Sequence, residues 1–221
     1  MCGRFTITRP AREVQELFNL TELPEFLQPR YNAAPSQMIP VVGLKPNSEE
    51  RGCVPMRWGF VPRWNKDEKG GFKPINAMRE TVATNGVFRA SFKDRRCLIP
   101  MDGFFEWQKV GKEKQPYLFR PAALAAFAGV WDAWKAPGSG EPVFTFAVIT
   151  TTPNSIVEPV HNRMPVILDP ACFAAWLDPN TPAAGALELL KPYPADKMTA
   201  VPVNRALNNA RHDAPDCIEP V

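Results

Sequence analysis

The sequence is poor in the residues that build metal sites and disulfide frameworks. It has two histidines, His161 and His212, and five scattered cysteines with no Cys-x-x-Cys pair. A four-ligand zinc site draws on closely spaced Cys and His residues, so none is expected, and no other metal or cofactor is indicated. An odd, dispersed set of thiols favours reduced cysteines in a reducing compartment over a disulfide framework.

Long apolar runs are also missing. No segment approaches the roughly 18 consecutive apolar residues of a membrane-spanning helix. The N-terminal residues have no hydrophobic signal-peptide core behind their charges. We therefore expect no membrane association and a cytoplasmic, nucleoid-associated protein. No oligomerisation signal is present, so a monomer is expected.

Proline is abundant, with 25 residues among 221, about twice the usual share of ~5%. Such frequent proline limits the length of regular elements and argues against a long-helix bundle or a coiled coil. Hydrophobic residues make up 45% and charged residues 22%, close to the average of soluble globular proteins, which excludes wholesale disorder.

The expected elements follow no alternating strand–helix rhythm. Helical spacing or a leading proline predicts helices over residues 10–20, 170–177 and 182–190. Apolar segments predict strands over residues 37–44, 51–60, 97–101, 104–110, 116–120, 125–134, 142–152, 164–168 and 201–203, with a turn at Asp102-Gly103. Loops are expected over residues 62–74 and 136–141. We expect an α+β fold with a single domain over residues 1–221, in which mostly antiparallel strands form a barrel-like curved sheet flanked by a few helices.

Positive charge is concentrated in one stretch of the chain. Ten basic and four acidic residues fall between Arg57 and Arg96, which gives this stretch a net charge of +6 within a chain of net charge +3. A basic stretch in a near-neutral protein suits a polyanion-binding surface. A solvated, loop-rich face would explain the same charges.

Cys2 is the first candidate for covalent chemistry. Removal of Met1 would leave a free α-amine and a thiol on adjacent carbons, and both groups are partly nucleophilic near neutral pH. A 1,2-aminothiol condenses with an aldehyde in two steps, first to a Schiff base and then to a five-membered thiazolidine. An N-terminal nucleophile also suits acyl transfer. On its own, the residue is more simply explained as a cysteine that stands second by chance.

Three further residues are candidates for polar roles at a site. Glu106 lies in the aromatic segment Asp102-Gly-Phe-Phe-Glu-Trp107, where desolvation would raise its pKa and make it a proton donor, unless a salt bridge holds it. His161 is expected in a loop just before a strand, a common place for site residues. Asn76 could hydrogen-bond a reacting group or cap a turn.

Nine short blocks occur in order along the chain. They are Cys2–Phe5, Arg30–Pro35, Trp58–Pro62, Ile75–Ala77 followed by Glu80-Thr81, Arg95–Pro100, Asp102–Trp107, Phe119–Trp131, the strand end at Thr150, and His161–Pro165. In this combination the chain strongly resembles the SRAP family (SOS response-associated peptidase), and the resemblance covers essentially its whole length.

The resemblance implies a protein that binds single-stranded DNA and covalently traps abasic sites, whose ring-opened sugar carries an aldehyde. Catalytic roles would fall to Cys2 as the double nucleophile, Asn76 as an orienting amide, Glu106 as general acid–base, and His161 as a proton shuttle. DNA contacts would fall to phosphate-binding or base-stacking residues, namely Arg4, Trp64, Arg79, Arg89, Trp107, Thr150 and Pro35.

One departure from the family pattern affects the expected DNA contacts. The family usually reads Asn-Ala-Arg-x-Glu-Thr, whereas this chain has Met78 at the arginine position and Arg79 one residue later. In an extended segment that shift turns the guanidinium to the opposite face. Arg79 is therefore expected to be a weak contact at most.

Two other functions remain open from the sequence. A thiol peptidase would use Cys2 to attack a carbonyl with His161 as base, including cleavage of its own N-terminus. A noncovalent single-strand-binding module would leave Cys2 incidental.

Overall fold

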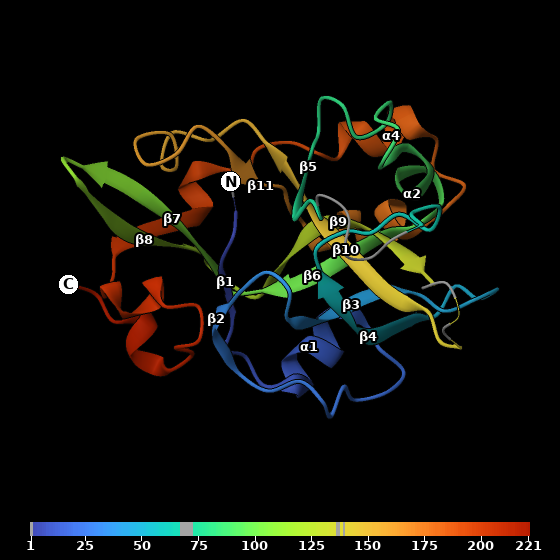
Figure 1. The fold of residues 1–221 in the computed structure, drawn as a ribbon, viewed down its shortest axis with the longest axis horizontal. Coiled ribbons are helices and arrows are strands. Elements are labelled where there is room, and N and C mark those ends of the chain that lie inside the picture. Colours follow the sequence, from blue (N-terminus) through green and yellow to red (C-terminus); the bar gives the residue numbers. More distant parts are fainter. Residues whose placement is uncertain (1, 67–72, 136–137, 139) are drawn as a thin grey trace.

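The computed structural model describes residues 2–66, 73–135, 138 and 140–221 (Figure 1). Its strands form two sheets. The smaller sheet is antiparallel, with the strand order β13-β8-β7-β1-β2. These strands are β1 (Phe5–Ile7), β2 (Arg30–Ala33), β7 (Gly103–Val110), β8 (Glu113–Pro121) and β13 (Met198–Pro202).

The larger sheet has the order β11-β10-β4-β3-β6-β9-β12, with β5 beside β10. Because β9 also pairs with β10, the pairings among β10, β4, β3, β6 and β9 return to their start as a ring. Only the pairings of β10 with β4 and β5 are parallel among the described strands, so the mostly antiparallel character is confirmed. The strands are β3 (Met38–Leu44), β4 (Arg51–Trp58), β5 (Asn76–Met78), β6 (Arg96–Met101), β9 (Ala125–Trp134), β10 (Val143–Thr151), β11 (Met164–Pro165) and β12 (Ile167–Leu168).

The helices are short and lie outside the ring of strands (Figure 1). The three predicted helices are confirmed, and α2 was not expected. Within the described ranges, no helix combines the length and apolar character needed to cross a membrane. The helices are α1 (Ala11–Phe18), α2 (Arg89–Asp94), α3 (Phe173–Leu177) and α4 (Ala183–Glu188), with 3-10 turns at η1 (Pro170–Cys172), η2 (Ala195–Lys197), η3 (Arg205–Asn208) and η4 (Pro215–Ile218).

Several predicted strands differ in detail. The strands on either side of Asp102-Gly103 enter different sheets, because the Asp102 carboxylate accepts hydrogen bonds from Thr6 and Thr8 and fixes the chain where it leaves one sheet for the other. The single strand predicted over residues 164–168 is two short strands, which pair with β10 and β9 respectively. The short strands β1, β2 and β5 were not predicted. Part of the loops expected at 62–74 and 136–141 lies outside the described residues.

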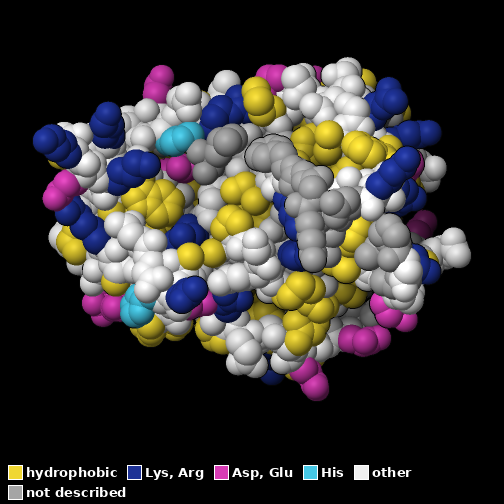
Figure 2. Space-filling model, in the orientation of Figure 1, with side chains coloured by type: hydrophobic (Ala, Val, Ile, Leu, Met, Phe, Trp, Pro, Cys, Tyr) yellow, Lys and Arg dark blue, Asp and Glu magenta, His cyan; other side chains and the backbone are white. Residues whose placement is uncertain are grey.

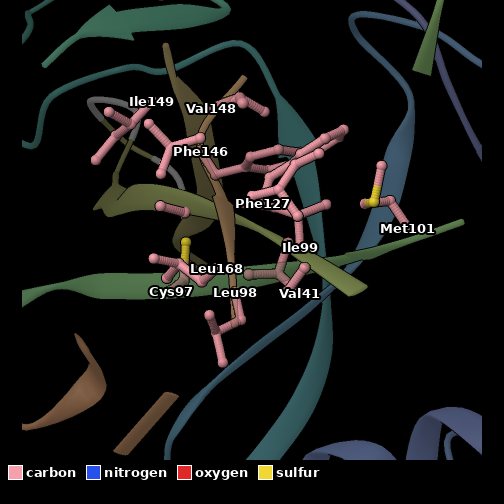
Figure 3. Close-up of a cluster of buried hydrophobic side chains, with 14 of the residues drawn as sticks. Val41, Cys97, Leu98, Ile99, Met101, Phe127, Phe146, Val148, Ile149 and Leu168 are labelled. Atoms are coloured by element: carbon pink, nitrogen blue, oxygen red, sulfur yellow. The ribbon is translucent and has the colours of Figure 1, made fainter. Parts of the chain in front are cut away.

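The main hydrophobic core fills the ring of strands (Figure 3). Nearly every residue of β9 is buried, since both neighbours of this strand, β6 and β10, belong to the ring. Gly129 in β9 faces Cys97 and Val148 in these neighbours. A Cβ at Gly129 would lie 2.4 Å from Cδ1 of Ile99 and 3.0 Å from the Ala147 carbonyl oxygen.

Gly129→Ala is therefore expected to destabilise the protein by about 1–3 kcal/mol, because the added methyl group overpacks a closed core. Gly43→Ala is the control, since a Cβ at Gly43 in β3 meets nothing within 4 Å. Urea denaturation followed by tryptophan fluorescence measures both. Equal stabilities of the two variants would contradict this packing.

Candidate active site

Cys2 lies at the entrance to the smaller sheet, just before β1. β1 is held between β2 and β7, with Phe5 opposite Ala33 on one side and opposite Phe104 on the other. The Cys2 side chain is fully buried. Its thiol donates to the Arg4 carbonyl oxygen at 3.9 Å, and Nδ2 of Asn76 donates to the Cys2 carbonyl oxygen at 2.9 Å.

Glu106 reaches the same place from β7. The residue is 3% exposed, and burial raises its pKa from 4.5 to about 7. Desolvation penalises the charged form of a carboxyl, which is the effect expected from its aromatic surroundings. Burial, and next the negative charge of Glu106, also raise the pKa of the Cys2 thiol well above its usual range. The resting thiol is therefore protonated at neutral pH.

His161 lies in the loop between β10 and β11 and completes the group. Its Nε2 is 3.9 Å from Oε2 of Glu106. Its Nδ1 lies 3.0 Å from the backbone nitrogen and 3.1 Å from the backbone oxygen of Arg163. Burial lowers the pKa of His161, so the ring is neutral at pH 7.

The four residues predicted as catalytic thus converge from four parts of the chain. Cys2 precedes β1, Asn76 begins β5, Glu106 lies in β7, and His161 follows β10. The group contains a thiol, an amide that binds the Cys2 carbonyl oxygen, a carboxyl with a pKa of about 7, and a neutral imidazole. Such a group suits a nucleophilic addition in which protons must be both donated and removed.

Sequence reasoning missed one ion pair beside this site. Arg163 donates from Nη1 and Nη2 to the two carboxylate oxygens of Glu80, at 2.8 and 2.9 Å, and from Nη2 to the Thr150 carbonyl oxygen at 2.8 Å. Hydrogen bonding from Arg163 lowers the pKa of Glu80. Both residues stand in blocks that carry the family resemblance, but no pattern links positions 83 residues apart.

The residues predicted to contact DNA differ in exposure and in how they are connected to the Cys2 site. Arg79 donates its backbone N–H to the carbonyl oxygen of buried Thr150 at 2.9 Å, beside the Glu80–Arg163 pair. Half-buried Trp107 lies under the Arg4 guanidinium at 6.0 Å and donates to Asn208 at 2.7 Å. Pro35 is half-buried, whereas Trp64 and Arg89 are exposed. In the described part of the chain no hydrogen bond or ring contact joins these last two to the Cys2 group.

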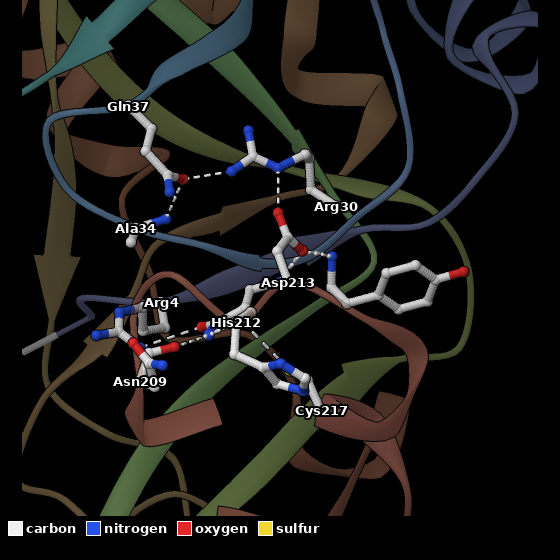
Figure 4. Close-up of polar contacts among 10 residues, drawn as sticks. Arg4, Arg30, Ala34, Gln37, Asn209, His212, Asp213 and Cys217 are labelled. Atoms are coloured by element: carbon white, nitrogen blue, oxygen red, sulfur yellow. Dashed lines mark hydrogen bonds and ion pairs between the residues drawn. The ribbon is translucent and has the colours of Figure 1, made fainter. Parts of the chain in front are cut away.

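The guanidinium of Arg4 is fixed by hydrogen bonds to other groups of the protein. Its Nη1 donates to Oδ1 of Asn32 at 3.1 Å and to the Leu207 carbonyl oxygen at 2.8 Å. Asn32 and Arg30 in turn bind the C-terminal segment, where Asp213 accepts from the backbone of Asn32 at 2.8 Å and from Nε of Arg30 at 2.5 Å (Figure 4). Arg4 is therefore a fixed cation, with part of its hydrogen-bonding capacity already used.

The basic stretch is divided between structural and exposed positions. Arg96 is buried and donates to backbone carbonyls, including that of Trp176 at 2.6 Å, and Arg63 and Arg95 share buried Asp132 at 2.8 and 3.3 Å. Other basic residues of this stretch are exposed, namely Lys66, Lys73, Arg89 and Lys93, and Lys69 lies outside the described residues. Figure 2 shows Lys and Arg side chains over one face of the molecule, with hydrophobic side chains between them. Only part of the predicted charge is thus available to a polyanion.

One group could hold a metal ion among the described residues. Ligand atoms of His212, Asp216 and Cys217 lie within 4.8 Å of one another. Nε2 of His212 already lies 2.7 Å from the Asp216 carboxylate, so this pair is satisfied without an ion. The group belongs to the C-terminal segment and is separate from the Cys2 site.

Comparison with known proteins gives a consistent result. The family model described as SOS response associated peptidase (SRAP) matches residues 1–210. The chain is 41% identical to the abasic site processing protein YoqW of Bacillus subtilis (strain 168), over 99% of both chains. It is 31% identical to the abasic site processing protein HMCES of Gallus gallus, over 100% of this chain and 78% of that protein. A crystal structure of a protein from Bacteroides thetaiotaomicron shares the fold over 100% of both chains, with a TM-score of 0.89 and 25% identity.

The burial of Glu106 predicts a specific dependence of stability on pH. Between pH 4.5 and about 7 the folded state keeps a proton on Glu106 that the unfolded state has lost. The free energy of unfolding of the wild type should therefore fall, relative to that of Glu106→Gln, by roughly 3 kcal/mol as pH rises through this window. Urea denaturation at pH 5 and pH 8 measures the difference. Glu113→Gln, at an exposed glutamate, is the control, and a pH-independent difference for Glu106→Gln would contradict the burial effect.

Proposed function

The chain belongs to the SRAP family, and on this premise we propose that it binds single-stranded DNA and forms a covalent crosslink to abasic sites through Cys2. The kinship with proteins named for abasic site processing supports a role in the response to such DNA damage. The convergence of Cys2, Asn76, Glu106 and His161 on one site carries the proposal.

The chemistry begins with removal of Met1, which frees the α-amine of Cys2. The amine adds to the aldehyde of a ring-opened abasic sugar, and the resulting carbinolamine loses one water to give a Schiff base. The Cys2 sulfur then bonds to the imine carbon, while its proton is transferred to the nitrogen. The product is a thiazolidine that holds the DNA to the protein through two bonds.

Proton transfer is required at each of these steps. A carboxyl with a pKa of about 7 is present in both protonation states at neutral pH, so Glu106 can donate to the departing water and accept from the incoming nucleophile. This matters for sulfur, because burial keeps the thiol protonated until a base removes its proton. The neutral ring of His161, beside Glu106, provides a second group for the same transfers.

Asn76 orients the two nucleophiles of Cys2. Its Nδ2 holds the Cys2 carbonyl oxygen at 2.9 Å, which fixes the backbone from which both nucleophiles project. A fixed backbone directs the amine and the thiol to the same carbon atom and so favours ring closure. The DNA strand would be held beside this group by Arg4, Trp107, Arg79, Thr150 and Pro35, with Arg89 and Trp64 as exposed contacts.

The alternative thiol peptidase, which would act in autoproteolytic maturation, has less support. Acyl transfer by cysteine begins with attack by a thiolate, and burial, which raises the pKa of the Cys2 thiol, disfavours a resting thiolate. Aldehyde trapping begins with the amine instead, and its sulfur step needs a base only after the imine has formed. A purely noncovalent DNA-binding module would leave the convergence of Asn76, Glu106 and His161 on Cys2 without a purpose.

Incubation with a single-stranded oligonucleotide that carries one abasic site tests the proposal. We expect a shifted band that survives boiling in detergent for protein from which Met1 has been removed. Cys2→Ala should abolish this band, because it removes the sulfur that stabilises the adduct, while binding to undamaged single strands in a fluorescence anisotropy assay should stay within about twofold.

Cys53→Ala is the matched control, since Cys53 is a half-buried thiol in β4, and it should crosslink like the wild type. Protein whose N-terminal amine is acetylated should fail to crosslink. A full yield of heat-stable adduct from either Cys2→Ala or the acetylated protein would rule out the mechanism.

A further inference from the structure

The side chain of Arg163 is largely buried and is held by several hydrogen bonds. Its two terminal nitrogens bind the two oxygens of Glu80, and Nη2 also binds the Thr150 carbonyl oxygen. The Arg163 side chain is 16% exposed and that of Glu80 is 41% exposed. Ion pairs this accessible add little to global stability, so the arrangement points to a local purpose.

The backbone of Arg163 lies directly against the catalytic ring. Its N–H donates to Nδ1 of His161 at 3.0 Å, and its carbonyl oxygen lies 3.1 Å from the same atom. A bare Nδ1 accepts from the N–H, and a protonated Nδ1 donates to the carbonyl oxygen. Nδ1 thus has a partner in each protonation state, and the ring has no need to turn when its charge changes.

We propose that Arg163 is a positioning residue for His161, with Glu80 as the residue that holds Arg163 in place. The Arg163 peptide binds Nδ1 of His161, and the clamp of the Arg163 side chain between Glu80 and Thr150 keeps that peptide fixed. Nε2 of His161 is thereby kept directed at Glu106, 3.9 Å away. This role deepens the proposed function and rests on it.

Two contacts together favour the tautomer of the neutral ring that carries its proton on Nε2. The Arg163 N–H, which can only donate, binds a bare Nδ1, and Nε2 faces a carboxyl oxygen of Glu106, which can accept from Nε2–H. In that form His161 presents an N–H to the Glu106 carboxyl and to the reacting atoms. Once the ring is charged, Nε2–H becomes an acid, and loss of its proton leaves Nδ1–H bonded to the Arg163 carbonyl oxygen.

Nuclear magnetic resonance of the imidazole nitrogens tests the positioning without any DNA. The chain has only two histidines, so a His161→Gln spectrum assigns the signals. The wild type should show a protonated Nε2 and a bare Nδ1 for neutral His161. In Glu80→Ala the two nitrogen shifts should move toward each other as the tautomers mix, and Glu80→Gln, which keeps one acceptor for Arg163, should lie between the two.

The crosslinking rate supplies the second readout. Glu80→Ala should slow adduct formation about tenfold and Glu80→Gln less, while the affinity for undamaged single-stranded DNA changes by less than about twofold. Glu113→Ala breaks another Arg–Glu pair, with Arg205 at 2.6 Å, and should alter neither readout.

These experiments distinguish a failure of the positioning role of Arg163 from a failure of the proposed crosslinking function. Unchanged His161 shifts in Glu80→Ala would overturn the positioning role, and so would a loss of rate matched by an equal loss of DNA affinity. His161 shifts that change as expected in Glu80→Ala, in a protein that forms no adduct, would refute the crosslinking function and leave the positioning role supported.

Discussion

The antiparallel pairing of β1 with β7 is the contact on which the candidate site depends. Phe5 lies opposite Phe104 in this pairing and packs edge-on against Trp58 and Phe127, with ring centroids 5.2 and 5.4 Å away. These contacts tie a strand of three residues to the main core. The Asp102 carboxylate binds Thr6 and Thr8 and secures the same strand from the start of β7. Because β1 cannot shift along β7, Cys2 is kept close to Glu106.

Burial then sets the chemistry of the groups brought together. Desolvation raises the pKa of Glu106 and of the Cys2 thiol and lowers that of His161, so each of these groups favours its neutral form. A site whose thiol and imidazole rest in their neutral forms, and whose carboxyl is present in both forms near pH 7, can admit an aldehyde and exchange protons with it. Charge lies at the edge of the site instead, in the fixed cation Arg4 and in the Glu80–Arg163 pair.

Sequence reasoning predicted the long apolar elements well and the short ones poorly. The strand over residues 125–134 is visible in the sequence because all its residues but Asp132 are apolar. In contrast, β1 and β5 have three residues each, too few for a periodic pattern, and their pairing with distant strands decides their structure. The candidate catalytic residues came from a family resemblance and from local chemistry. The clamp of Glu80 on Arg163 and the internal bonds of Arg4 depend on contacts between distant segments, which no local pattern contains.

The most direct test of the central claim is a tandem mass spectrum of the N-terminal peptide, taken from the crosslinked protein after digestion of the DNA and treatment with iodoacetamide under denaturing conditions. If Cys2 closes a thiazolidine, the spectrum places the sugar remnant on Cys2, with a mass lower by one water. The Cys2 sulfur then carries no alkyl group, whereas the other four cysteines are alkylated. A remnant on a lysine side chain, or an alkylated Cys2 beneath the remnant, would contradict a bond through both nucleophiles.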